Sequence, residues 1–257
     1  MAAELTLSTG TLLGFLVTLV RVSGVFVFVP LPGIRTGGME AARVMLSLSV
    51  RVALFPQWPR VAGEGSIGLL LLWLLSEAAM GIGIGLTVAF VTEAVSMAAQ
   101  VMGLQAGYAY ASTIDPATQA DSGILVIFAQ LASGLMFFTL GMDREVLRIF
   151  ARSLEVLPAG SILLSRGAGE HLLSLGALMF STGLRLALPV VAVLVLVDVS
   201  LALLGRINSQ LQLLTVAFPI KMMVGLFVLS WVAMLLPVLF RAEAATTFAA
   251  IRNLAGR

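Results

Sequence analysis

The sequence predicts an all-α, polytopic membrane protein, and three observations lead to this prediction. Of its 257 residues, 60% are hydrophobic and 11% are charged, with a mean hydropathy of +1.07, whereas a soluble domain has about 25% charged residues. The apolar runs are long enough to cross a bilayer, and they lack the alternation of a membrane β-strand. Lipid leaves unpaired backbone groups unsatisfied, so we expect helices. Helical hairpins from about six hydrophobic segments would form one domain, residues 1–257.

The first two segments are residues 12–31 and 39–55. The first contains Arg21 and is closed by Pro30, Pro32 and Gly33. Residues 1–8 contain an acid and no Lys or Arg, unlike the basic start of a signal peptide. We therefore expect a retained first membrane helix. The second segment is shorter, and its polar residues recur every four positions along one helical stripe: Arg43, Ser47 and Arg51.

The third segment, residues 68–107, is too long for a simple membrane span. As one helix it would extend about 60 Å against a hydrocarbon core of about 30 Å, so it must bend, break or continue beyond the membrane. Gly81 and Gly85 favour close helix packing, and their apolar helical context argues against a nucleotide-binding loop. Small and polar residues three or four apart predict a slowly rotating face: Glu77, Gly81, Gly85, Ala89, Glu93, Ser96, Gln100, Gly103 and Gly107.

The remaining segments are residues 123–142, 172–204 and 211–240, with a charge-rich stretch at 143–171. Charges also lie inside the apolar runs, and a charge at mid-depth costs about 2.5–3.5 kcal/mol. We interpret these interior charges as structural pairs, for example Arg185 or Lys221 with Asp198. A proton relay near Pro189 and Pro219 is the alternative. The interior charges are Arg21, Glu77, Arg185, Asp198, Arg206 and Lys221.

Composition and motifs argue against several classes of function. The chain has no cysteine and one histidine, which disfavours a thiolate or histidine metal site. It has no P-loop and no G-x-S-x-G elbow. The pI of 9.7 rests on a net charge of only +2, without the basic cluster of a nucleic-acid interface. We therefore expect no catalytic residues, no cofactor, no metal and no nucleic-acid partner.

The stretch 102–121 differs from its apolar neighbours. It carries glycines and two tyrosines and ends in an Asp-Pro turn signal, so it is either a plain connection or a segment that folds into a protein cavity. Its lack of charge up to position 114 favours a plug over a solvated loop. The residues that we assign to this plug are Gly103, Gly107, Tyr108, Tyr110, Asp115 and Pro116.

Several of these runs resemble one known family. They are G-L-Q-A-G-Y-A-Y-A-S-T-I-D-P at 103–116, L-P-V-V-A-V-L-V-L-V-D-V-S-L-A-L-L-G-R-I-N-S-Q-L at 188–211 and F-P-I-K-M-M-V-G at 218–225. An arginine in the first helix followed by P-L-P-G at 30–33 looks similar too. In order and spacing, the whole chain resembles the FliR family of flagellar type III export-gate proteins.

The resemblance implies an export-gate subunit in the bacterial inner membrane, at the flagellar basal body. It implies a helical assembly with FliP-like and FliQ-like subunits and an FlhB-like switch protein, through which unfolded flagellar substrates pass. It also implies that residues 103–121 plug the closed pore. A virulence type III secretion gate subunit is the alternative with the same architecture. A proton-coupled small-molecule transporter is the alternative from a different class, and it predicts function by the chain alone.

Overall fold

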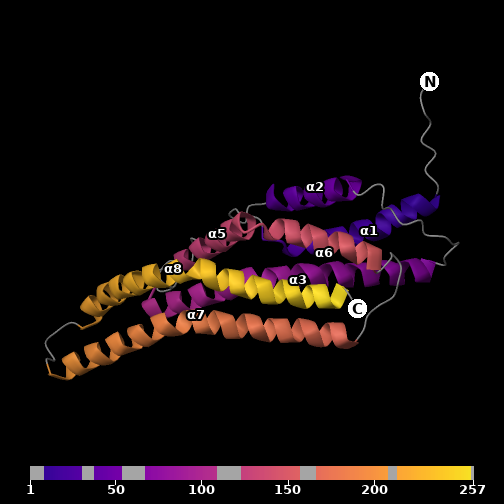
Figure 1. The fold of residues 1–257 in the computed structure, drawn as a ribbon. Coiled ribbons are helices and arrows are strands. Elements are labelled where there is room, and N and C mark those ends of the chain that lie inside the picture. Colours follow the sequence, from indigo (N-terminus) through magenta and orange to yellow (C-terminus); the bar gives the residue numbers. More distant parts are fainter. Residues whose placement is uncertain are drawn as a thin grey trace. The chain divides into compact units, whose positions relative to one another are not determined.

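The chain is helical throughout the residues that the structure describes. In this computed structural model these are residues 9–30, 38–53, 67–108, 123–156, 166–207 and 213–255. Seven helices and no strand lie in these ranges (Figure 1), which confirms the predicted all-α class. The helices are α1 (Thr9–Phe28), α2 (Gly38–Ala53), α3 (Ile67–Ala106), α5 (Ile124–Thr139), α6 (Met142–Val156), α7 (Arg166–Ile207) and α8 (Leu213–Ala255).

Four of the described helices are long and apolar enough to cross a membrane. These candidate spans lie in α1, α3, α7 and α8, and the bent pair α5 and α6 makes a fifth if it counts as one span. The α2 helix is apolar but shorter. The chain is thus a polytopic helical membrane protein, as its composition predicts.

The long apolar runs form continuous helices. Helix α3 has 40 residues without a break. At about 1.5 Å per residue it is about 60 Å long, about twice the thickness of a hydrocarbon core. Helix α7 continues through Pro189, and α8 continues through Pro219 and Pro237. Membrane helices tolerate proline because neighbouring groups compensate the lost hydrogen bond. The discontinuous helices that a relay site would need are therefore not formed at these prolines.

The charge-rich stretch after residue 142 begins with a helix. Helix α6 has one buried face, made by Met142, Val146, Ile149, Phe150 and Ser153. Arginines four residues apart occupy the exposed face, and one of them, Arg148, pairs with Glu145 at 3.3 Å. This i, i+3, i+4 spacing of buried positions is that of an amphipathic helix.

The described helices group into two compact units. The first unit contains α1, α2, α6, the part of α3 up to Ala89, the part of α7 up to Leu175 and the end of α8 from Thr246. Helix α1 packs against α2. The buried apolar side chains of the first unit include Val17, Val22, Val25, Ile149 and Phe150.

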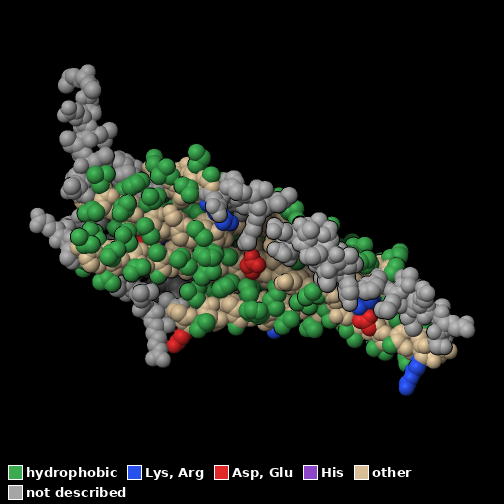
Figure 2. Space-filling model, turned by 180° about the vertical axis from the view of Figure 1, so that it is seen from behind, with side chains coloured by type: hydrophobic (Ala, Val, Ile, Leu, Met, Phe, Trp, Pro, Cys, Tyr) green, Lys and Arg blue, Asp and Glu red, His purple; other side chains and the backbone are tan. Residues whose placement is uncertain are grey.

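The second unit contains α5 and the remaining parts of α3, α7 and α8. Its buried side chains include Ala98, Phe137, Val190, Leu194 and Phe240. Three of the four boundaries between the units fall inside the continuous helices α3, α7 and α8, and the fourth lies between α5 and α6. Figure 2 shows that hydrophobic side chains predominate on the visible described surface and that charged side chains there are few.

Candidate functional site

A fully buried ion pair lies in the first unit. Arg21 of α1 and Glu77 of α3 both have side chains with 0% exposure. The Arg21 Nε donates to Glu77 Oε2, and Nη2 donates to Oε1 at 2.8 Å. The remaining nitrogen, Nη1, donates to the carbonyl oxygen of Ser153 at 3.0 Å. A planar guanidinium matches a carboxylate in two parallel bonds, so this cluster joins α1, α3 and α6.

Glycines bring α1 and α3 together beside this pair. A Cβ at Gly81, one turn after Glu77, would lie 2.2 Å from the carbonyl oxygen of Arg21. A Cβ at Gly85 would lie 2.8 Å from the carbonyl oxygen of Val25, and one at Gly24 would lie 2.9 Å from the backbone nitrogen of Ile82. Side chains at these positions would separate the helices, which supports the prediction that Gly81 and Gly85 are packing positions.

The second unit contains a smaller polar cluster around Asp198 of α7. Lys221 of α8 lies 2.9 Å from Asp198 Oδ1 and donates to Oδ2 at 3.0 Å. Gln105 of α3 donates to the same Oδ2 at 3.1 Å. The side chains of Lys221 and Asp198 are 17% and 42% exposed. The geometry therefore favours the predicted structural pairing of Asp198 with Lys221 rather than with Arg185.

The end of α3 lies next to this cluster. Gly107 has φ of +87° and donates its N–H to the carbonyl of Leu104 at 3.2 Å, while Tyr108 donates to that of Gly103 at 3.0 Å. These two bonds and the positive φ form a Schellman cap. The Tyr108 hydroxyl then donates to the carbonyl oxygen of Met222 at 3.1 Å. Burial raises the pKa of Tyr108 above its ordinary value, so this hydroxyl stays a donor at neutral pH.

The expected plug residues divide between α3 and the segment after it. Gly103 is a buried residue inside α3, and not part of a connection, which corrects our assignment. The helix reaches this far because its stop signal is Gly107. Tyr110, Asp115 and Pro116 lie outside the described residues.

Two of the expected interior charges lie on the surface of this chain. The side chains of Arg185 and Arg206 are exposed on this chain, and the structural pairing expected of such charges stays a prediction for these two. Helix α7 is apolar on most sides, so its sequence does not distinguish an inward from an outward position.

The small and polar residues predicted along α3 follow a slowly rotating face, as expected. Glu77 is buried but Glu93 is exposed. Four-residue steps advance about 40° each, so after four steps the side chain points about 160° away. Glu93 therefore points away from the side to which Glu77 points, while Ser96 and Gly103, further along α3, are buried again.

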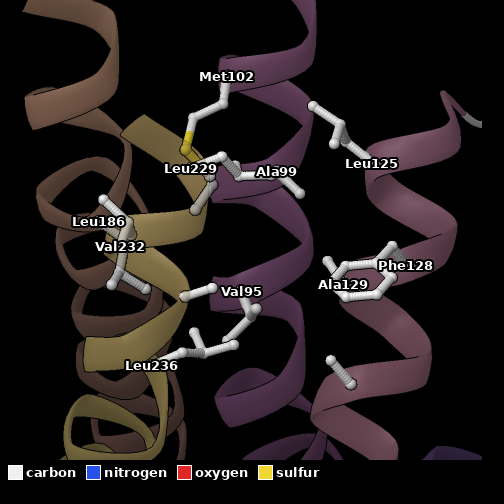
Figure 3. Close-up of a pocket in the computed structure, with 13 residues that line it drawn as sticks. Val95, Ala99, Met102, Leu125, Phe128, Ala129, Leu186, Leu229, Val232 and Leu236 are labelled. Carbon is white, nitrogen blue, oxygen red and sulfur yellow. The ribbon is translucent and has the colours of Figure 1, made fainter. Parts of the chain in front are cut away.

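An apolar pocket of about 60 Å³ lies in the second unit (Figure 3). Figure 3 shows Val95, Ala99 and Met102 of α3 between Leu125 and Phe128 of α5 on one side and residues of α8 on the other. All its lining residues are apolar, so it offers no acid, base or nucleophile. Across the described ranges, no group of three or more His, Cys, Asp or Glu residues could hold a metal ion.

Sequence reasoning missed three residues of these clusters: Gly24, Gln105 and Ser153. Gly24 had a readable signal, because it follows Arg21 by one helical turn in an apolar helix. Ser153 lies on the apolar stripe of α6. No sequence signal pointed to Gln105, since its partner Asp198 is 93 positions away.

These features define a class: a polytopic helical membrane protein whose helices are joined by buried polar contacts and glycine-mediated packing. The family described as "Bacterial export proteins, family 1" matches residues 12–246. The chain therefore belongs to this family of bacterial export proteins.

The chain is similar to several proteins named "Flagellar biosynthetic protein FliR". It is 31% identical to that of Escherichia coli (strain K12) over 169 residues, which cover 65% of this chain and 64% of the relative. It is 30% identical to that of Pectobacterium carotovorum subsp. carotovorum over 166 residues, 64% of each chain. With that of Bacillus subtilis (strain 168) it shares 25% identity over 243 residues, 93% of each chain. The chain thus spans 64% of the length of the first two relatives.

Proposed function

We propose that this chain is a subunit of a flagellar type III protein-export gate and forms part of a closed pore for unfolded flagellar substrates. The observation that carries the proposal is the family match over residues 12–246, together with relatives that bear the name FliR. These names favour the flagellar assembly over the virulence assembly. The structure is compatible with a subunit of a membrane channel, because the chain contains long apolar helices and the residues that line the described pocket include no catalytic group.

The proposed setting is the bacterial inner membrane, at the flagellar basal body. The proposed partners are FliP-like and FliQ-like gate subunits and an FlhB-like switch protein. We also propose that residues 1–257 act as one domain, since α3, α7 and α8 each run through both compact units. The chain then has a structural role in transport and is not an enzyme.

We propose further that the segment following α3 is the plug of the closed pore. The Schellman cap at Gly107 ends the helix, and the Tyr108 hydroxyl fastens the start of the segment to the Met222 carbonyl. The charge-free composition up to residue 114 suits a plug. Tyrosine adds bulk with a polar tip, which fits a partly wet channel.

Two measurements test this function. First, the chain is isolated in mild detergent from cells that also make the candidate partners, and the co-purified membrane proteins are identified. Recovery of a multi-subunit complex is expected, whereas transport of a small solute by the chain alone would favour the transporter. Second, residues 109–113 are deleted, and the conductance of membranes that contain the assembled complex is recorded.

The deletion is expected to leave the complex intact and to let ions leak through it. A five-residue deletion between α6 and α7, in the range 157–165, serves as the matched control and should leave the membrane tight. An assembled complex that stays ion-tight after deletion of residues 109–113 would show that this segment is only a connection.

A further inference from the structure

Arg185 is an exposed charge in the middle of an apolar helix. It lies in α7, within the candidate membrane span Leu172–Ile207, and its side chain is exposed. The ion pairs in the described ranges do not include Arg185. In contrast, Arg21, which lies in the candidate span Gly10–Phe28, is fully buried against Glu77. Among the described residues, Arg185 therefore has no ion-pair partner of the kind that Arg21 has.

The geometry of α7 places Arg185 directly away from α3. A Cβ at Gly183 would lie 2.9 Å from the carbonyl oxygen of Ala94 and 3.2 Å from Met97 Sδ, so Gly183 faces α3. Arg185 follows by two positions, a rotation of about 200°. The same inward face contains Ala187, Val190 and Leu194, which are almost fully buried. The exposure of Arg185 thus follows from the helix rotation that packing against α3 imposes.

The outward face around Arg185 is mostly apolar, with Ser181 and Thr182 as its partly exposed polar neighbours. The large aliphatic side chains on this face are between 44% and 66% exposed: Leu184, Leu188, Val195, Leu196 and Val199. Exposure to water is unfavourable for these aliphatic side chains, and contact with lipid acyl chains is unfavourable for the charged arginine. A surface that combines both matches a protein helix with the complementary pattern, apolar with one acidic residue.

We infer that the outward face of α7 docks a membrane-embedded helix of another chain, and that a carboxylate on that helix pairs with Arg185. Charge complementarity selects this occupant, because a guanidinium among aliphatic side chains recognises an acid better than any other side chain. The inference rests on the proposed function only in that a gate subunit has neighbouring membrane proteins. It adds which face one neighbour covers and what chemistry the contact requires.

The test compares two substitutions in the whole complex. Arg185→Lys keeps the positive charge on an aliphatic stem, and Arg185→Leu removes the charge but keeps an aliphatic side chain. Each variant is produced with the full set of partners, solubilised in mild detergent and analysed by quantitative mass spectrometry. Arg185→Leu is expected to lower the yield of one membrane partner by about tenfold or more, because it leaves that partner's acid buried and unpaired. Arg185→Lys should lower the yield much less.

Folding of the variants is checked separately. Because the Arg185 side chain is exposed, Arg185→Leu should leave the melting temperature of the detergent-solubilised chain unchanged. Arg185→Glu should also lose the partner, and substitution of Lys for the matching acid in that partner should restore it. Such reciprocal rescue would identify the pair.

The failures of the two proposals are distinguishable. A wild-type chain that retains no membrane partner would overturn the proposed function and the docking inference together. A wild-type chain that retains partners, with Arg185→Leu retaining them equally well, would overturn the docking inference alone. Equal partner yield with loss of bound anionic phospholipid from Arg185→Leu would assign this face to lipid headgroups, and it would also overturn the inference.

Discussion

Replacement of Gly81 by alanine tests the idea that the buried ion pair depends on the close approach of α1 and α3. The new Cβ would lie 2.2 Å from the carbonyl oxygen of Arg21, and 3.0 and 3.1 Å from its carbonyl carbon and Cα. These are backbone atoms, so no side-chain rotation relieves the overlap. Helix α1 must therefore move away from α3 by about 1 Å to reach van der Waals contact.

The magnitude follows from what that movement disrupts. Overpacking of a tight contact costs about 1–3 kcal/mol. The Arg21 Nη2–Glu77 Oε1 bond of 2.8 Å would lengthen past hydrogen-bond range, and full loss of a buried pair costs about 3–5 kcal/mol. Alanine stabilises a helix by about 1 kcal/mol relative to glycine, which offsets part of this cost. With partial loss of the pair, we expect a net destabilisation of about 2–4 kcal/mol.

Gly83 provides a matched control on the same helix. A Cβ at Gly83 would meet only Leu172 Cδ1, at 3.8 Å, so Gly83→Ala should be neutral or stabilising by up to about 1 kcal/mol. Thermal unfolding in detergent, followed by tryptophan fluorescence, compares the two variants. A shift of about 2–4 °C per kcal/mol in a chain of this size puts Gly81→Ala about 4–16 °C below wild type. Equal melting temperatures for Gly81→Ala and Gly83→Ala would refute the reasoning.

Three other predictions concern the polar clusters. Arg21→Met should cost about 3–5 kcal/mol because it leaves the buried Glu77 carboxylate unpaired, and the double variant with Glu77→Met should unfold at a higher temperature than either single variant. Asp198→Asn should lower the free energy of unfolding by less than about 1 kcal/mol, because exposure screens the Lys221 pair. Transport should persist after Asp198→Asn, and loss of transport in an intact complex, with a shifted pH profile, would support the proton relay instead. Gly107→Ala should cost about 1–2 kcal/mol at its left-handed conformation, and hydrogen exchange at the Tyr108 amide should become faster.

The sequence predicts the helices well because lipid makes the signal strong. Every apolar run must be helical, so the expected runs at 68–107 and 123–142 correspond to α3 and α5. The extension of α8 to Ala255 was not predicted, since hydropathy falls after residue 240 although the helix continues. Helix α6 was also missed as an element, because its charges hid an apolar stripe that is visible once the i, i+3, i+4 positions are counted.

The site was less predictable than the helices. A charge inside an apolar run is visible because of its cost, and in this way Arg21 and Glu77 were found. Their pairing depends on which helices are neighbours, and 56 positions separate the two residues. For Arg185, the apolar residues surround α7 on all sides, so hydropathy does not indicate which side packs against α3. The contact between Gly183 and Ala94 decides this.

The long sequence separations inside the buried cluster have a consequence for the synthesis of the chain. Arg21 needs Glu77, 56 positions later, and Ser153, 132 positions later. At about 5–20 residues per second, the guanidinium leaves the ribosome about 3–11 s before its carboxylate and about 7–26 s before the Ser153 carbonyl. During this interval an isolated α1 would expose its arginine to lipid. The nascent first helix therefore has to wait at the insertion machinery, or at the membrane surface, until α3 arrives.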